Sequence, residues 1–188
     1  MKPSQLKETA ERYIYEEYTG WDDDERCELI DGVIHMLSSP SQAHQETLLE
    51  IGVQFRNLLK GNSCKVFMAP FDVCLSAKGD KDSTVVQPDI FVVCDKSKLD
   101  GKRCNGAPDM VVEILSASTS RRDMVIKFNK YLQAGVREYW MIDPDRKIVL
   151  VNILENGNYI AHAYCERDIV PVHILDGCKI DMRDVFTE

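Results

Sequence analysis

The segment from residue 109 to residue 143 constrains the fold most strongly, because it joins two strand patterns through one helical pattern. Its first part, DMVVEIL at 109–115, is a short and mostly apolar run that is typical of a strand. Helical spacing then continues to about Ala134, Gly135 is suited to end a helix, and EYWMID begins a second strand. This alternation predicts a sheet that is covered on at least one face by helices.

The rest of the chain adds further helices and strands to this unit. The pattern predicts a weak amphipathic helix over 5–18, a hairpin over 26–37 that turns at Asp31-Gly32, and a helix over 42–59. Strands are predicted at about 64–68 and 71–75, along VVQPDIFVV, and in three runs after residue 137. The order predicts an α+β (α/β-like) protein with a mixed central sheet flanked by helices, to which an N-terminal helix and hairpin are added.

The length of 188 residues suits one domain, and no internal repeat or low-complexity linker divides the chain. We expect an N-terminal extension at 1–37, a core at 38–165 and a C-terminal ribbon at 166–188. No apolar run approaches the ~20 residues that a membrane helix needs, and the polar start lacks a hydrophobic signal region. We therefore expect a cytoplasmic protein with no membrane partner.

Seven cysteines, at 27, 64, 74, 94, 104, 165 and 178, contain no CxxC pair and no close Cys/His cluster. In a reducing compartment, a buried cysteine behaves as a small hydrophobic residue. We expect this of all seven, with a zinc site as the alternative.

The charge balance is acidic, with 31 acidic against 23 basic side chains and a formal net charge of −8. Such a balance counts against a strong nonspecific DNA-binding protein. Basic residues gather only in segments 96–103 and 119–130, which predicts either a local basic rim or a solvated loop and helix face.

Two carboxylates interrupt apolar strand patterns. Glu113 lies among valines, isoleucine and leucine, and Asp89 follows Pro88 at the start of IFVV. A buried carboxylate needs a hydrogen bond, an ion pair or a metal, and paired carboxylates are suitable ligands for Mg²⁺ or Mn²⁺. The alternative is that each acid lies at the end of a strand, where its side chain is exposed to solvent.

The predicted helix after residue 120 can bring a cation to these acids. The apolar stripe of Met124, Phe128 and Leu132 is expected to face the sheet. Asp123, Lys127 and Tyr131 run directly beside it, so Lys127 could reach the carboxylates. An ordinary surface ion pair is the alternative for Lys127, and an N-terminal capping role with Ser120 is the alternative for Asp123.

These residues belong to a longer string that resembles a known family. ELIDG (28–32), SPSQAH (39–44), QPD (87–89) and GAPDMVVEILSASTSRRDMVIKFNKYLQAGVREYWMIDP (106–144) are similar to the Uma-type family of bacterial endonucleases. That family lies within the PD-(D/E)XK restriction-endonuclease-like superfamily. The resemblance covers about residues 10–165 and implies a restriction-endonuclease-like fold.

The resemblance implies a divalent-metal-dependent endonuclease. Asp89, Glu113 and the Ile114 carbonyl would hold Mg²⁺ or Mn²⁺, and nucleic acid, with DNA favoured, would be the substrate. The superfamily lysine two residues after the strand carboxylate is replaced by Leu115, and the family pattern implies that Lys127 supplies the ammonium instead. Glu28 and His44 would be auxiliary residues that complete a metal shell or orient water, with His44 as a proton shuttle. A role at the edge of the core or as a cap is the alternative for each.

Two other classes of function stay open at this stage. A catalytically inactive binding or assembly protein would explain the acidic balance, Leu115 and the lack of a helix-turn-helix module. A metal enzyme that acts on small molecules could use the same scaffold. No P-loop or Rossmann glycine motif is found, so we expect no nucleotide cofactor. A homodimer would suit cleavage of both DNA strands.

Overall fold

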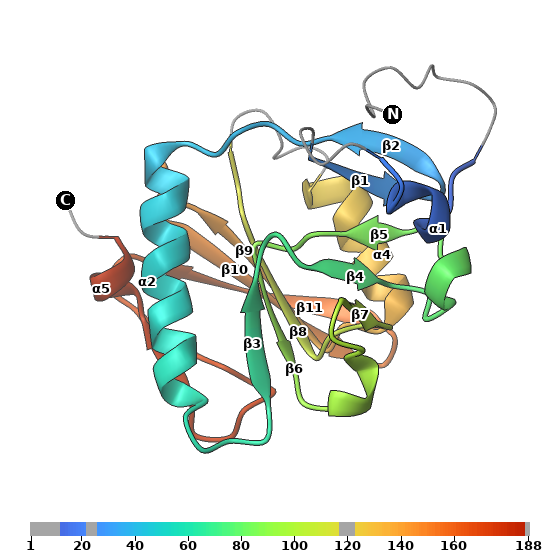
Figure 1. The fold of residues 1–188 in the computed structure, drawn as a ribbon. Helices are drawn as coiled ribbons and strands as arrows, with labels where there is room; N and C mark the ends of the chain where they lie inside the picture. Colours follow the sequence, from blue (N-terminus) through green and yellow to red (C-terminus); the bar gives the residue numbers. More distant parts are fainter. Residues whose placement is uncertain (1–11, 22–25, 117–122, 187–188) are drawn as a thin grey trace.

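The computed structural model describes residues 12–21, 26–116 and 123–186, and these form a mixed α+β fold (Figure 1). The larger sheet has six strands, in the order β11 (Asn158–Cys165), β10 (Ile148–Glu155), β9 (Glu138–Asp143), β8 (Met110–Ile114), β6 (Ile90–Val93) and β3 (Lys65–Met68). Strands β8 and β9 are parallel, whereas the other neighbours in this sheet are antiparallel. The mixed sheet expected from the sequence is confirmed.

A second sheet has five strands, in the order β2 (Val33–Met36), β1 (Cys27–Ile30), β5 (Val85–Val86), β4 (Asp72–Cys74) and β7 (Arg103–Asn105). The predicted hairpin forms β1 and β2, and its turn residues Asp31 and Gly32 have φ angles of 53° and 79°. The hairpin is not an isolated addition, because β1 also pairs with β5. A separate ribbon pairs β12 (Ile169–Pro171) with β13 (Lys179–Asp181).

Helices cover both faces of the larger sheet. On one face, Ile51 and Phe55 of α2 (Gln42–Leu58) pack in a cluster that includes Val112 and Ile114 of β8. On the other face, Tyr131 of α4 (Phe128–Ala134) packs in a cluster with Val111 and other strand residues. This burial on both sides explains the nearly continuous apolar sequence of β8.

Local sequence signals predict some helix boundaries correctly and others not. Ser41 caps α2 by accepting a hydrogen bond from the His44 amide at 3.2 Å, and Gly135 ends α4 in the left-handed conformation, with φ 83°. The helix predicted over 5–18 is wrong in extent: α1 covers Tyr15–Tyr18, residues 12–14 are not helical, and 1–11 lie outside the described residues. The Ser120 capping box also lies outside them.

Shorter helical segments complete the fold. They are η2 (Gly79–Lys81), η3 (Lys96–Lys98), α5 (Met182–Val185) and a π-helical turn, η4 (Asp123–Lys127), which leads into α4. Among the helices that the structure describes, none combines the length and the apolar character needed to cross a lipid bilayer.

The chain passes from the smaller sheet to the larger one at Gln87, Pro88 and Asp89. The apolar run VVQPDIFVV predicts one continuous strand, but β5 ends at Val86 and β6 begins at Ile90. Proline cannot donate a backbone hydrogen bond to a strand ladder, which explains the interruption. The break places Asp89 where the two sheets meet.

The expectation that all seven cysteines are free is wrong for two of them. Cys64 forms a disulfide with Cys94. In the antiparallel register of β3 and β6, Lys65 lies opposite Val93, so Cys64 and Cys94 occupy the next opposing positions. The other five cysteines are not part of a disulfide.

Candidate functional site

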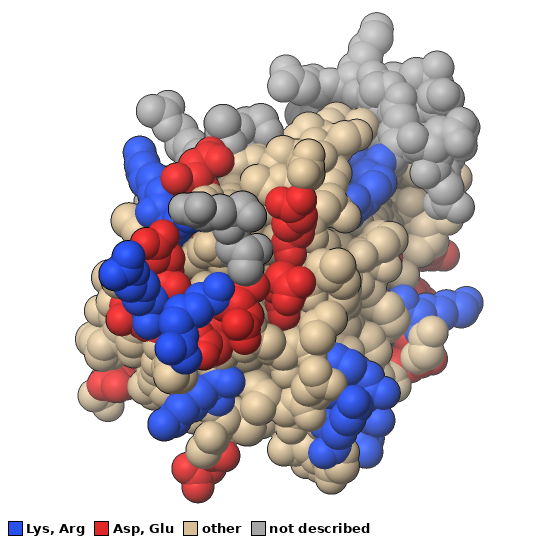
Figure 2. Space-filling model, turned by 90° about the vertical axis from the view of Figure 1, so that its left-hand side faces the viewer, with Lys and Arg blue, Asp and Glu red and all other residues tan. Residues whose placement is uncertain are grey.

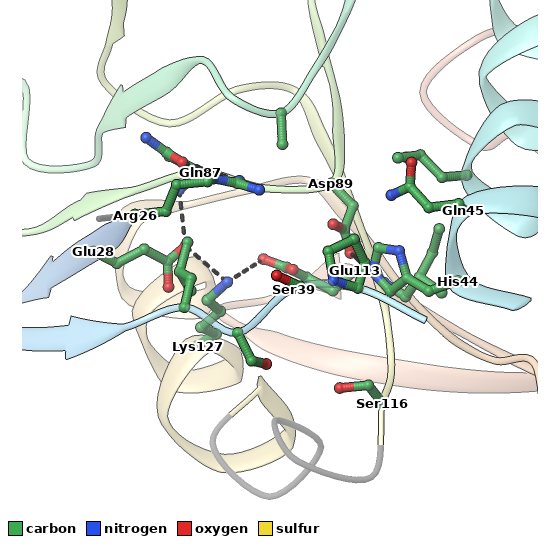
Figure 3. Close-up of a pocket in the computed structure, with 16 residues that line it drawn as sticks. Arg26, Glu28, Ser39, His44, Gln45, Gln87, Asp89, Glu113, Ser116 and Lys127 are labelled. Atoms are coloured by element: carbon green, nitrogen blue, oxygen red, sulfur yellow. Dashed lines mark hydrogen bonds and ion pairs between the residues drawn. The ribbon is translucent and has the colours of Figure 1, made fainter. Parts of the chain in front are cut away.

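A cavity of about 300 Å³ lies where the two sheets meet the N-terminal end of α2 (Figure 3). Three carboxylates line it, Glu28, Asp89 and Glu113, together with the cations Arg26 and Lys127. His44, Gln87 and Ile114 also contribute to its wall. The cavity therefore collects side chains from β1, from the break before β6, from β8, from η4 and from α2.

Asp89 and Glu113 come together through the pairing of β6 with β8. Ile90 lies opposite Val112 in this antiparallel ladder, so Asp89 and Glu113 occupy the next opposing positions. Opposed residues project to the same face of a sheet. The Asp89 carboxylate accepts a hydrogen bond from the Ile114 amide at 2.8 Å and lies 3.2 Å from Nε2 of His44. Two acids 24 positions apart in sequence thus share one cavity.

Lys127 bridges two of the acids. Its Nζ lies 2.9 Å from Oε1 of Glu28 and 2.9 Å from Oε1 of Glu113. The exposed fractions of the three side chains are 4%, 0% and 4%, respectively, so this is a buried ion cluster. Leu115, at the position of the superfamily lysine, instead packs against the cluster on the α4 side of the sheet. The ammonium next to Glu113 therefore comes from the helix.

Tyr131, one helical turn after Lys127, completes the surroundings of Glu113. Its hydroxyl donates a hydrogen bond of 2.6 Å to Oε1 of Glu113. Burial raises the pKa of the Tyr131 phenol well above its usual value, so the hydroxyl stays protonated and remains a donor. Lys127 and Tyr131 are the centre of the buried face, whereas Leu132 is only half-buried. Of the apolar stripe expected to face the sheet, Phe128 does pack against it, beside Tyr139 of β9. The structure does not describe the side chains of Asp123 and Met124.

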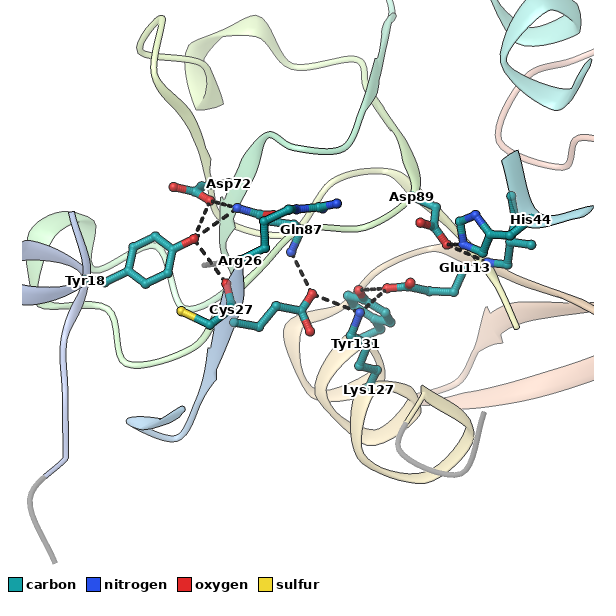
Figure 4. A network of polar contacts seen from close by, with 12 residues as sticks. Tyr18, Arg26, Cys27, His44, Asp72, Gln87, Asp89, Glu113, Lys127 and Tyr131 are labelled. Atoms are coloured by element: carbon teal, nitrogen blue, oxygen red, sulfur yellow. Dashed lines mark hydrogen bonds and ion pairs between the residues drawn. The ribbon is translucent and has the colours of Figure 1, made fainter. Parts of the chain in front are cut away.

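Gln87 connects this cluster to the N-terminal part of the chain (Figure 4). Its backbone amide donates a hydrogen bond of 2.8 Å to Oε1 of Glu28. Its side-chain Nε2 donates to the Tyr18 hydroxyl and to Oδ1 of Asp72, both at 3.0 Å. Its Oε1 accepts a hydrogen bond of 3.2 Å from Arg26. Apart from its position beside Pro88 and Asp89, nothing in the sequence indicates a role for Gln87.

The donor set of the cavity fits a divalent cation. Two of its three carboxylates pair with Lys127, the third lies beside His44, and Oε2 of Glu28 is buried without a hydrogen-bonding partner in the described structure. Among residues 12–21, 26–116 and 123–186, no three His, Cys, Asp or Glu side chains are grouped as a metal site. Mg²⁺ typically uses one or two carboxylates and completes its shell with water and other oxygens. Asp89 and Glu113, which line the same cavity, would supply the two carboxylates of such a shell.

The basic segment 96–103 lies away from this cavity. It follows the far end of β6, whereas Asp89 precedes the near end. Lys98 donates to the Ala107 carbonyl, and Arg103 pairs with Asp80 and Asp100. On the side that carries α2 and α5, acidic and basic side chains are interspersed (Figure 2). Segment 96–103 is therefore not a basic rim of the cavity.

Comparison with known proteins identifies the family. The sequence model of the Uma2 family, which is described as "Putative restriction endonuclease", matches residues 15–183. An uncharacterized protein from Synechocystis sp. is 30% identical over 157 residues, which cover 81% of this chain and 80% of that protein. The crystal structure of a "putative nuclease belonging to DUF820" from Anabaena variabilis shares the fold, with a TM-score of 0.73, 21% identity and coverage of 93% of this chain and 97% of that one. Because the family model covers most of its length, the chain belongs to the Uma2 family.

Proposed function

We propose that this protein is a divalent-metal-dependent endonuclease that hydrolyses phosphodiester bonds of nucleic acid. The observation that carries the proposal is the buried pair of Glu28 and Glu113 around Lys127, together with the partly exposed Asp89 in the same cavity. The excess negative charge of this group favours a cation, and its oxygens suit Mg²⁺ or Mn²⁺. The family assignment agrees with a nuclease of this kind.

In the proposed mechanism, Asp89, Glu113 and the Ile114 carbonyl would hold the metal. When bound, such a metal polarises a phosphate oxygen and acidifies water. The Ile114 amide fixes the Asp89 carboxylate, and the Tyr131 hydroxyl fixes Glu113. Both acids therefore meet a ligand in one orientation, which lowers the cost of organising the site.

Lys127 and His44 are the groups proposed to act on the reacting phosphate and water. Glu28 and Glu113 hold the Lys127 ammonium in place, and a fixed cation stabilises the negative charge that develops on a phosphate in the transition state. His44 lies beside Asp89, and its Nδ1 has no hydrogen-bonding partner among the described residues. Its position beside Asp89 supports the proposal that this imidazole acts as the proton shuttle.

The proposal includes DNA as the favoured substrate and a homodimer as the form that would cut both strands. The test is a cleavage assay on single- and double-stranded DNA and RNA, with Mg²⁺ or Mn²⁺ at low salt. Asp89→Asn should abolish cleavage and metal binding, whereas Lys127→Ala should greatly reduce turnover and leave metal affinity nearly intact or slightly raised. Asp145→Asn, at an exposed turn, is the matched control that should cleave like the wild type.

The assay also separates the enzyme from an inactive binding protein. Metal binding should be measured directly by calorimetry on the same preparations. Equal cleavage by the wild type and both site variants would indicate a contaminating nuclease. That result, with no loss of metal binding in Asp89→Asn, would contradict the proposal and favour a protein that keeps the fold for binding or assembly.

A further inference from the structure

We propose that Arg26 binds a phosphate of the nucleic-acid strand that enters the cavity, and that Gln87 positions it for this contact. The inference rests on the proposed function and adds to it a residue that holds the substrate. Arg26 lines the same cavity as Asp89, Glu113 and Lys127, but it is exposed where Lys127 is buried. A ligand can therefore reach its guanidinium.

The orientation of Arg26 is fixed by an amide. The Nε2 of Gln87 donates to both Tyr18 and Asp72, so its Oε1 must face the other way, toward Arg26. In Figure 4 the Arg26 side chain runs alongside Gln87, and its guanidinium lies on the side toward Asp89. The hydrogen bonds from Gln87 to Asp72 and from Arg26 to Gln87 thus hold the guanidinium at the edge of the three carboxylates.

The charge of Arg26 is not neutralised by this contact, because the partner is a neutral amide. No carboxylate of a described residue forms an ion pair with Arg26, whereas Arg103, Arg137 and Arg183 each pair with an aspartate. Lys127, the other cation of the cavity, already lies between two carboxylates. Arg26 therefore carries the positive charge that remains available to an anionic ligand.

A phosphodiester is the anion that this arrangement fits. The guanidinium presents several N–H donors in one plane and matches the oxygens of a phosphate better than an ammonium does. The carboxylates beside it would repel an approaching nucleic-acid backbone, so a cation at the rim is needed to hold the strand. Since segment 96–103 lies elsewhere, Arg26 is the exposed arginine of this cavity.

The experiment compares two arginines that differ in position and not in charge. Arg26→Gln and Arg56→Gln each remove one positive charge, but Arg56 lies near the far end of α2 and lines a separate apolar groove. Affinity for labelled single- and double-stranded oligonucleotides would be measured by fluorescence anisotropy in Ca²⁺, at several salt concentrations. Thermal melting would verify that each variant is folded, and Arg26→Lys keeps the charge while removing the planar donor group.

Arg26→Gln should weaken binding roughly tenfold at low salt and reduce the slope of log affinity against log salt by about 0.9 for duplex DNA or about 0.7 for single strands. Arg26→Lys should keep the slope but bind more weakly than the wild type. Gln87→Leu should lose part of the affinity, and Arg56→Gln should change it less than twofold.

If Arg26→Gln and Arg56→Gln bind alike, Arg26 is not a phosphate contact, although the proposed nuclease would stand. If the wild type binds no nucleic acid at any salt concentration, both proposals fail together.

Discussion

Replacing Lys127 with methionine tests the buried ion cluster directly. The substitution keeps most of the side-chain volume but leaves Glu28 and Glu113 without their shared cation. Removal of one partner from a buried ion pair typically costs 3–5 kcal/mol. In the variant, Glu28 keeps its hydrogen bond from the Gln87 amide, and Glu113 keeps its hydrogen bond from the Tyr131 hydroxyl. We therefore expect the free energy of unfolding to fall by about 3 to 4 kcal/mol, in the lower part of this range. For a chain of this length, that lowers the melting temperature by roughly 6–16 °C.

The loss should depend on the cations in the solution. Mg²⁺ should restore part of the stability, because it can replace the missing positive charge.

Urea unfolding followed by tryptophan fluorescence, in EDTA and again with added Mg²⁺, measures these differences, since the Trp140 indole is fully buried in the folded protein. Lys130→Met is the control, because Lys130 pairs with the exposed Asp31 and should cost less than about 1 kcal/mol. A loss below 1 kcal/mol for Lys127→Met would refute the reasoning.

Three further outcomes are expected. Tyr131→Phe removes the hydrogen bond to Glu113 and should lower the free energy of unfolding by about 1–2 kcal/mol in urea titrations; no loss would mean that this hydroxyl is not a buried donor. Burial raises the pKa of Tyr15 to about 12 from 10.0 in the unfolded chain, so stability should fall as the pH rises from 10 to 12, which absorbance at 295 nm and a Tyr15→Phe comparison can follow. Reduction of the Cys64–Cys94 disulfide, which encloses a separation of 30 residues, should cost roughly 3–4 kcal/mol, measured by unfolding with the free thiols counted by alkylation and mass spectrometry.

Much of the architecture follows from signals that are local in sequence. Asp31-Gly32 permits the tight turn of the hairpin, and Gly135 adopts the left-handed conformation that ends α4. These positions are informative because their conformations exclude most other residues. The break at residues 87–89 was less evident, because apolar residues on both sides suggest one strand and only Pro88 indicates otherwise.

The candidate site was predictable where a charged residue interrupts an apolar pattern. Glu113 and Lys127 stand out in this way, and the structure brings them to 2.9 Å. Gln87 does not stand out, because a neutral amide is common at any surface position, and its importance depends on Tyr18 and Asp72 from distant segments. The Cys64–Cys94 pair likewise depends on the register of β3 against β6, which the sequence does not specify.

The assembly of the cavity from distant segments has a consequence for synthesis on the ribosome. Glu28 lies on β1, whereas Lys127, which pairs with it, is 99 positions later in the chain. Because domains are made from the N-terminus and non-local contacts form only when both segments are present, a nascent chain lacks the ion cluster until the helix after residue 122 has emerged. Chains that stop before this helix would have Glu28, Asp89 and Glu113 but no ammonium between them. An incomplete translation product would therefore carry the acids of the cavity without the cation that holds them together.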